Sequence, residues 1–253
     1  MTLIAAISCK SRPKASEIAS SSRHDGGGYR VCPGGADPCR VLPLGDSITD
    51  AYNAPGGYRI ELYRAALREG KRIRFVGSQS NGPERVDGYP FPRAHEGHSG
   101  YTIDEAPAAE RRGLLGIAEQ AVRDSEPNIV LLMIGTNDVS LDLDLQHAPA
   151  RLARLIDTIL RVDPTLLLVV AELPPTRNDA LNLRISGYNA ALAGLVAERV
   201  AAGRHLLLVD MNAAFTRDAS YKATLLEDDL HPNPAGYDRL GQAWYAALRN
   251  VLH

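Results

Sequence analysis

From residue 41 onward, short and nearly continuous apolar runs alternate with longer stretches in which apolar residues recur every three or four positions. The short runs predict five strands, at residues 41–44, 73–76, 129–134, 166–170 and 206–209. Runs without polar alternation are typical of strands buried on both faces of a parallel sheet.

Helical periodicity is clearest over residues 181–202, where Ile185, Tyr188 and Leu192 fall on one face. Similar apolar stripes predict helices at residues 58–67, 152–160 and 237–252. Strands that alternate with helices favour an α/β fold, a three-layer α/β/α sandwich around a five-stranded parallel sheet.

The first part of the chain has a different character. Residues 10–38 are rich in Ser, Gly and Pro and lack apolar periodicity, so we expect residues 1–38 to be a flexible leader and 39–253 a single domain. A short apolar run before Cys9 is similar to the end of a bacterial lipoprotein signal but lacks a basic region. A truncated export signal and a tail without function both stay open.

Composition narrows the classes of protein. The chain holds 28 Lys+Arg against 30 Asp+Glu, a net charge of -2, which argues against nucleic acid as a partner. No apolar run approaches the ~20 residues of a membrane span. With 3 Cys and no paired CxxC, a zinc site is disfavoured, while a local disulfide between Cys32 and Cys39 stays open.

Polar residues follow two predicted strands. Gly45-Asp46-Ser47 comes directly after the first strand, and Gly135-Thr136-Asn137-Asp138 follows the third. Ligands of open α/β sheets bind at the carboxyl ends of strands. Ser47 is therefore a candidate nucleophile, with a simple helix cap as the alternative for this tripeptide.

A serine nucleophile needs a base and a carboxylate that orients the base. Asp228 and His231, three residues apart before the last predicted helix, can supply both on one turn. The neighbouring Asp229 is an alternative to Asp228.

Acyl transfer also needs donors for the developing oxyanion. The side-chain amide of Asn137 is one candidate, and the backbone N–H of Gly100 is another. Gly97 competes with Gly100; the family resemblance described next favours Gly100, because Ser99-Gly100 followed by an expected helix start is similar to that family's usual small-residue–glycine pair.

Together, Gly45-Asp46-Ser47, Gly100, Gly135-Thr136-Asn137-Asp138 and Asp228-x-x-His231 resemble the four ordered blocks of the SGNH (GDSL-type) hydrolases. The resemblance covers residues 39–253 and implies a flavodoxin-like fold. It implies Ser47 as nucleophile, His231 as base and Asp228 as its partner. The implied oxyanion hole consists of the Ser47 and Gly100 N–H groups and the Asn137 side chain, and no cofactor is implied.

Within that superfamily, residues 56–59, 96–103 and 134–139 are similar to acetyl-xylan-esterase-like carbohydrate esterases. The implied activity is hydrolysis of short acyl esters, above all acetyl esters of carbohydrate, through a covalent acyl-enzyme. The substrate would be a small-molecule or polysaccharide ester, and the protein a secreted or cell-surface monomer. A lipid-directed member such as a lysophospholipase or thioesterase is the alternative. A binding module without catalysis is disfavoured by the intact Ser47, Asn137 and His231.

Three further sequence features bear on metal binding and on sugar binding. His95 and His98 lack the spacing of a helical zinc motif. The acidic loop with Asp138, Asp142 and Asp144 fits a solvated face better than a Ca²⁺ site. Four tyrosines are candidates for stacking on sugar rings or, equally, for loop packing: Tyr52, Tyr58, Tyr89 and Tyr101.

Overall fold

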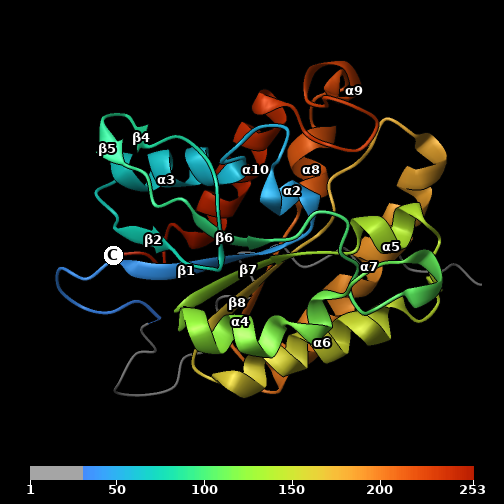
Figure 1. The fold of residues 1–253 in the computed structure, drawn as a ribbon, viewed down its shortest axis with the longest axis horizontal. Helices are drawn as coiled ribbons and strands as arrows, with labels where there is room; N and C mark the ends of the chain where they lie inside the picture. Colours follow the sequence, from blue (N-terminus) through green and yellow to red (C-terminus); the bar gives the residue numbers. More distant parts are fainter. Residues whose placement is uncertain (1–30) are drawn as a thin grey trace, which may run out of the picture.

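The computed structural model describes residues 31–253, so the expected signal near Cys9 and most of the expected leader lie outside the described residues. A central sheet is covered by helices on both faces (Figure 1). The sheet has the order β3-β6-β1-β7-β8-β9, with β2 also paired to β1. Its strands are β1 (Cys39–Gly45), β2 (Ile73–Phe75), β3 (Gln79–Ser80), β6 (Ala94–Gly97), β7 (Ile129–Met133), β8 (Leu167–Ala171) and β9 (Leu206–Val209).

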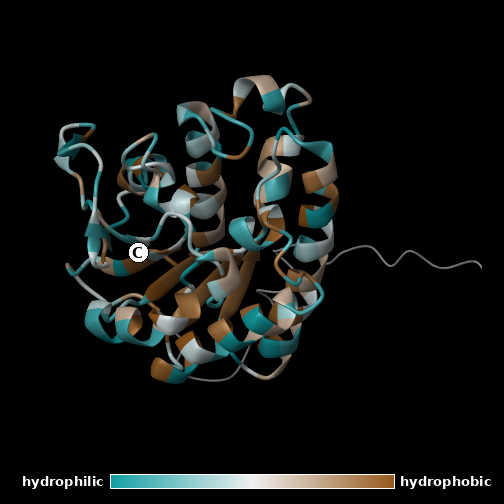
Figure 2. Cartoon of the chain, turned by 45° about the vertical axis from the view of Figure 1, so that its right-hand side comes forward, coloured by the Kyte–Doolittle hydropathy of each residue, from teal (hydrophilic) through white to brown (hydrophobic). Residues whose placement is uncertain are grey.

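The predicted α/β/α class is confirmed. All five predicted strands are present as β1, β2, β7, β8 and β9, and each of their pairings is parallel. Every residue of β7 and β8 is buried, which explains why their sequences lack polar alternation. Figure 2 shows hydrophobic residues concentrated on these central strands.

Within residues 31–253 the sheet holds seven strands rather than the five predicted. β6 lies parallel to β1, with Gly45 opposite Gly97, and β3 pairs antiparallel with β6. A separate hairpin joins β4 (Arg85–Val86) to β5 (Tyr89–Pro90). The Ala-His-Glu-Gly sequence of β6 has no apolar run, because the fold buries its His95 and Glu96 with polar partners.

The helices form the outer layers. One face of the sheet carries α3, α8 and α10, and the other carries α4, α6 and α7 (Figure 1). The longer helices are α3 (Tyr58–Arg68), α4 (Ala118–Ser125), α6 (Ala148–Val162), α7 (Asp179–Ala201) and α10 (Pro234–Leu248). The shorter ones are α2 (Ser47–Asp50), α5 (Thr136–Ser140), α8 (Met211–Thr216), α9 (Tyr221–Thr224) and the 3₁₀ turns η1 (Pro107–Ala109) and η2 (Leu114–Gly116).

The helix expected directly after Gly100 is absent, and this expectation was wrong. Residues 101–113 instead form a loop that contains η1, with bridges between Thr102 and Gly113 and between Ala106 and Arg111. The backbone N–H of Ile103 donates to the side chain of Asp138, 35 residues away, instead of to a local carbonyl. A tertiary partner therefore takes the place of a helical hydrogen bond.

At the amino-terminal end, the structure joins Cys32 to Cys39 in a disulfide. Val31 and Cys32 are buried in the core, so the packed structure includes residues that the sequence assigned to the leader. Between residues 31 and 253 no helix combines the length and apolarity that crossing a membrane requires.

Candidate active site

Three loops meet at one edge of the sheet because the strands before them are neighbours. Gly45 at the end of β1 is in register with Gly97 of β6 on one side and with Met133 of β7 on the other. The loops that follow β1, β6 and β7 therefore lie side by side at the carboxyl edge, the expected place of a ligand site.

The nucleophile turn, residues 45–50, is embedded in the core. Asp46 caps α2 by accepting a hydrogen bond from the Ile48 N–H at 3.0 Å. Ser47 is the first residue of α2, so its own N–H has no carbonyl one turn earlier to bond. A Cβ at Gly45 would lie 2.4 Å from the Met133 carbonyl oxygen, so only glycine allows this close approach.

Asp46 is a fully buried carboxyl group. Burial raises its pKa to about 6, although hydrogen bonds from the Ile48 N–H and the Thr136 side chain act in the opposite direction. The nucleophile turn thus contains a carboxyl group whose ionisation the core opposes.

His231 lies against Ser47. Its Nε2 atom is 2.9 Å from Ser47 Oγ, and its Nδ1 atom is 2.8 Å from Asp228 Oδ2. A carboxylate only accepts hydrogen bonds, so Nδ1 carries the proton and Nε2 is free to accept the serine proton. The structure therefore brings together Ser47, His231 and Asp228.

The acid–base turn, residues 228–233, is organised around the side chain of Asp228. Asp228 Oδ1 accepts hydrogen bonds from the N–H groups of Leu230 at 2.7 Å and His231 at 2.6 Å. Partial burial acts to raise the pKa of Asp228, but these bonds and His231 outweigh it and lower the pKa below its ordinary value. Asp229, the alternative acid, contributes its carbonyl oxygen to the Arg177 N–H.

One residue that the sequence reasoning missed docks the acid–base turn onto the rest of the site. Asn53 donates from Nδ2 to the Pro232 carbonyl at 3.1 Å and accepts from the Tyr237 hydroxyl at 3.2 Å. Asn53 lies only six residues after Ser47, yet nothing in the linear sequence links it to Pro232.

The oxyanion loop, residues 97–101, supplies the candidate donor Gly100. This residue has a φ of +81°, and within the described chain its N–H donates to no protein acceptor. The N–H of Gly97, the competing glycine, is engaged with His95 Nδ1 at 3.1 Å. The geometry therefore favours Gly100 over Gly97.

Asn137 joins this loop to the end of β7. Its Nδ2 atom donates to the Tyr101 carbonyl at 2.8 Å. A side-chain amide carries two hydrogens, so a second one stays available for a ligand.

The sequence did not reveal the side-chain contacts that anchor the oxyanion loop. Ser99 donates to Asp50 Oδ2 at 2.6 Å, and Asn81 donates to the other Asp50 oxygen at 3.2 Å. His98 contacts Glu96 at 2.7 Å and stacks on Tyr101. The two residues before Gly100 are thus tied to β6 and to the nucleophile turn.

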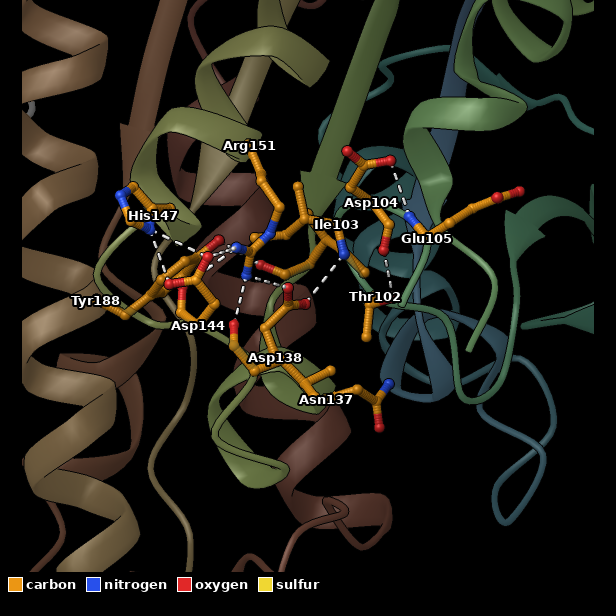
Figure 3. A network of polar contacts seen from close by, with 12 residues as sticks. Thr102, Ile103, Asp104, Glu105, Asn137, Asp138, Asp144, His147, Arg151 and Tyr188 are labelled. Carbon is orange, nitrogen blue, oxygen red and sulfur yellow. Dashed lines mark hydrogen bonds and ion pairs between the residues drawn. The ribbon is translucent and has the colours of Figure 1, made fainter. Parts of the chain in front are cut away.

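Asp138 is buried and joins the loop after Gly100 to α6, so it is not part of a solvated face (Figure 3). Its Oδ2 accepts from the Ile103 N–H at 3.0 Å and its Oδ1 from Arg151 at 3.0 Å. Burial outweighs these bonds and raises the pKa of Asp138. Asp144 pairs with His147 and Arg151.

Asp142, the remaining carboxylate of the acidic loop, pairs with Arg184. Each of the three carboxylates in this loop therefore has a cationic partner. In the part of the chain that the structure describes, no three His, Cys, Asp or Glu side chains cluster as a metal ion would require.

A serine that contacts a histidine, itself oriented by a carboxylate, is the arrangement of serine-dependent acyl transfer. The α/β/α fold and this site together define the class of carboxylic ester hydrolases. The chain belongs to the GDSL-like lipase/acylhydrolase family, whose family model matches residues 44–239.

Individual relatives agree with this family. The chain is 30% identical over 235 residues to a multidomain esterase of Ruminococcus flavefaciens, a match that covers 86% of this chain and 29% of that protein. The chain thus spans less than a third of that relative's length.

Solved structures carry the same fold. A Clostridium thermocellum family 3 carbohydrate esterase is 31% identical, with a TM-score of 0.71, over 85% of this chain and 97% of that one. A carbohydrate esterase family 3 structure from Talaromyces cellulolyticus is 23% identical, with a TM-score of 0.67, over 84% of this chain and 97% of that one.

Proposed function

We propose that this protein is a serine esterase that removes short acyl groups, chiefly acetyl, from carbohydrate through a covalent acyl-enzyme. One observation carries the proposal. Ser47 Oγ, His231 and Asp228 form a continuous line of contacts at 2.9 and 2.8 Å, beside a glycine N–H that donates to no acceptor in the described chain.

The first half of the reaction forms the acyl-enzyme. Ser47 Oγ attacks the ester carbonyl carbon while His231 Nε2 takes the hydroxyl proton. The negative charge on the former carbonyl oxygen is stabilised by the N–H groups of Ser47 and Gly100 and by the Asn137 amide. His231 then gives its proton to the alcohol oxygen, which leaves as the free sugar hydroxyl.

The second half releases the acid. A water molecule loses a proton to His231 Nε2 and attacks the acyl carbon, again through an oxyanion at the same donors. The bond to Ser47 Oγ breaks, and His231 returns its proton to that oxygen. Asp228 accepts a hydrogen bond from Nδ1 throughout and stabilises the imidazolium form of His231.

Two observations support a short acyl group and a carbohydrate alcohol. The first is the resemblance of residues 56–59, 96–103 and 134–139 to acetyl-xylan-esterase-like carbohydrate esterases, which implies a short acyl group. The structural neighbour that is 31% identical is itself named a carbohydrate esterase.

We also propose that the protein works outside the reducing cytosol, secreted or at the cell surface. The Cys32–Cys39 disulfide supports this, because disulfides persist mainly in oxidising compartments. Fractionation of a native host, with the protein found only inside the cell in reduced form, would contradict this localisation.

The test is a comparison of acyl chain lengths. We expect kcat/KM to fall steeply from p-nitrophenyl acetate to octanoate and palmitate, and acetylated xylan to release acetate. Mass spectrometry of rapidly quenched enzyme should find one acetyl group on Ser47, and none in Ser47→Ala. Faster turnover of palmitate would instead favour a lipid-directed enzyme, and sugar binding without turnover a binding module.

A further inference from the structure

Tyr52 is a large aromatic side chain that the chemistry above does not use. It is 56% exposed, and its ring lies edge-on to the His231 ring with the centroids 5.4 Å apart. An exposed aromatic beside reacting groups is a common form of ligand contact, because its apolar face gains from being covered.

The other tyrosines from the sequence hypothesis do not share this position. Tyr58 is fully buried, and its hydroxyl contacts Thr49. Tyr101 is stacked on His98. Tyr89 is 58% exposed but belongs to the β4–β5 hairpin, which lies at the opposite end of α3 from α2 (Figure 1).

The turn that carries Tyr52 is fixed at both ends. The N–H of Ala51, which has a left-handed φ of 56°, donates to the Ser47 carbonyl at 2.8 Å. The following Asn53 is held between the Pro232 carbonyl and the Tyr237 hydroxyl. An aromatic ring on such a fixed turn loses little conformational freedom when a ligand covers it.

The reaction geometry decides which part of an ester meets Tyr52. The leaving alcohol oxygen must approach His231 Nε2 to receive its proton, while the carbonyl oxygen must point to Gly100 and Asn137. The alcohol half of the ester therefore lies on the His231 side, next to Tyr52, and the acyl group lies away from it.

We propose that Tyr52 is the platform for the sugar ring that carries the scissile ester, a subsite for the alcohol half of the substrate. The ligand class is a pyranose with an acetylated hydroxyl. The C–H face of the sugar packs on the phenol ring, and the phenol hydroxyl meets sugar hydroxyls at its rim. This inference rests on the proposed carbohydrate esterase function and adds the residue that selects the sugar.

The test holds the acyl group constant and varies the alcohol. Purified enzyme is assayed with an acetylated xylo-oligosaccharide and with ethyl acetate, whose alcohol is too small to cover the ring. In Tyr52→Ala we expect the ratio of kcat/KM for the sugar ester to that for ethyl acetate to fall about tenfold, mainly through KM for the sugar ester. Tyr52→Phe and Tyr52→Trp should keep most of the ratio.

Tyr89→Ala is the matched control, because it removes an equally exposed tyrosine away from the site, and its ratio should stay at the wild-type value. An unchanged ratio in Tyr52→Ala, or an equal loss on both substrates, overturns the inference, since the ring would then only support His231. If the wild-type enzyme hydrolyses ethyl acetate but no sugar acetate, the proposed carbohydrate function fails instead, and that result is visible before any variant is made.

Discussion

The nucleophile turn and the acid–base turn hold two aspartates in opposite environments. Asp46 is fully buried, and burial raises its pKa to about 6. Asp228 has a half-exposed side chain, and hydrogen bonds from His231 and Leu230 outweigh the effect of burial and lower its pKa. The pKa of an aspartate side chain is thus raised in the nucleophile turn and lowered in the acid–base turn.

The difference follows from how each turn is supported. The nucleophile turn depends on the packed ends of β1, β6 and β7, and it uses Asp46 as a helix cap at the cost of burying a carboxyl group. In the acid–base turn, Asp228 accepts hydrogen bonds from residues 230 and 231, and Asn53 and Arg177 hold the turn from outside. Changes at Gly45 or Asp46, whose contacts pack the nucleophile turn, should therefore affect both stability and activity, and changes at Asp228 should affect mainly activity.

The largest effect should come from Ser47→Ala. Removing the attacking oxygen should lower kcat/KM by at least about 10³-fold, because no other group can form the acyl-enzyme. The side chain becomes smaller at a position that is 6% exposed, so the melting temperature should change little. Retention of more than a few per cent of the wild-type kcat would reject Ser47 as the nucleophile.

The next largest effect distinguishes the roles of Asp228 and Asp229 in the acid–base turn. Asp228→Asn should lower kcat by roughly 10²- to 10⁴-fold, since the amide cannot stabilise the imidazolium form of His231 as a carboxylate does. Asp229→Asn is the control and should stay within about twofold of wild type. Steady-state kinetics beside thermal unfolding checks both, and the reverse ranking would move the assignment to Asp229.

Asn137→Ala tests the end of β7 and should lower kcat by about 10²- to 10³-fold with little change in KM. The lost bond to the Tyr101 carbonyl should also lower the melting temperature slightly. A fall in melting temperature with an unchanged kcat per folded molecule would assign Asn137 a structural role alone.

A smaller effect is expected at Ser99, which ties the oxyanion loop to Asp50. Ser99→Ala removes a hydrogen bond to a charged group, and we expect kcat to fall about tenfold while KM stays near its wild-type value. Ser99→Thr keeps the hydroxyl and should restore most of the activity. Equal losses in Ser99→Ala and Ser99→Thr would show that the hydrogen bond does not position Gly100.

The smallest effect is a pH dependence of stability. The pKa of Asp46 is raised from 3.8 to about 6, so the unfolded chain loses this proton first as the pH rises. The stabilising contribution of the protonated group is therefore complete below about pH 4 and is lost as the pH rises to about 6.

Asp46→Asn removes this titration, so urea unfolding at pH 4, 5, 6 and 7 should show the wild type losing free energy of unfolding relative to the variant as the pH rises. The lowered pKa of Asp228 works the other way: its contribution is present above its ordinary pKa and is lost as the pH falls. Asp228→Asn should therefore change how the free energy of unfolding falls at acid pH, below the ordinary pKa of an aspartate. A constant difference between wild type and Asp46→Asn would contradict the burial argument.

Features with a local cause could be predicted from the sequence. The strands at 129–133 and 167–171 are found because burial on both faces demands apolar residues at successive positions. The Asp228-x-x-His231 pair is found because three residues on one turn suffice to bring the carboxylate to Nδ1. The Cys32–Cys39 pair is equally local, although spacing alone could not decide whether the bond forms.

Features without a local cause were missed or misjudged. β6 is a strand only because β1 offers an edge and because Ser78 and His98 satisfy its buried Glu96. In the acidic loop, Asp142 and Asp144 are exposed, as a solvated face requires, but Asp138 is buried against Arg151 of α6. Ser78 lies 18 residues from Glu96 and Arg151 lies 13 residues from Asp138, and the periodicity of the sequence does not indicate contacts at such separations.

By itself, the sequence determined the alternation of strands and helices, the residue types of the acyl-transfer machinery and their order along the chain, because hydrophobic periodicity and side-chain chemistry are local properties. Only the tertiary structure decided that Ser47 and His231, 184 residues apart, stand 2.9 Å from each other. It also decided that Gly100 rather than Gly97 keeps an open N–H, and that Tyr52 alone of four candidate tyrosines is both exposed and beside His231. Distances, burial and hydrogen-bond partners of this kind arise when neighbouring strand ends bring separate loops together, and they have no counterpart in the linear pattern.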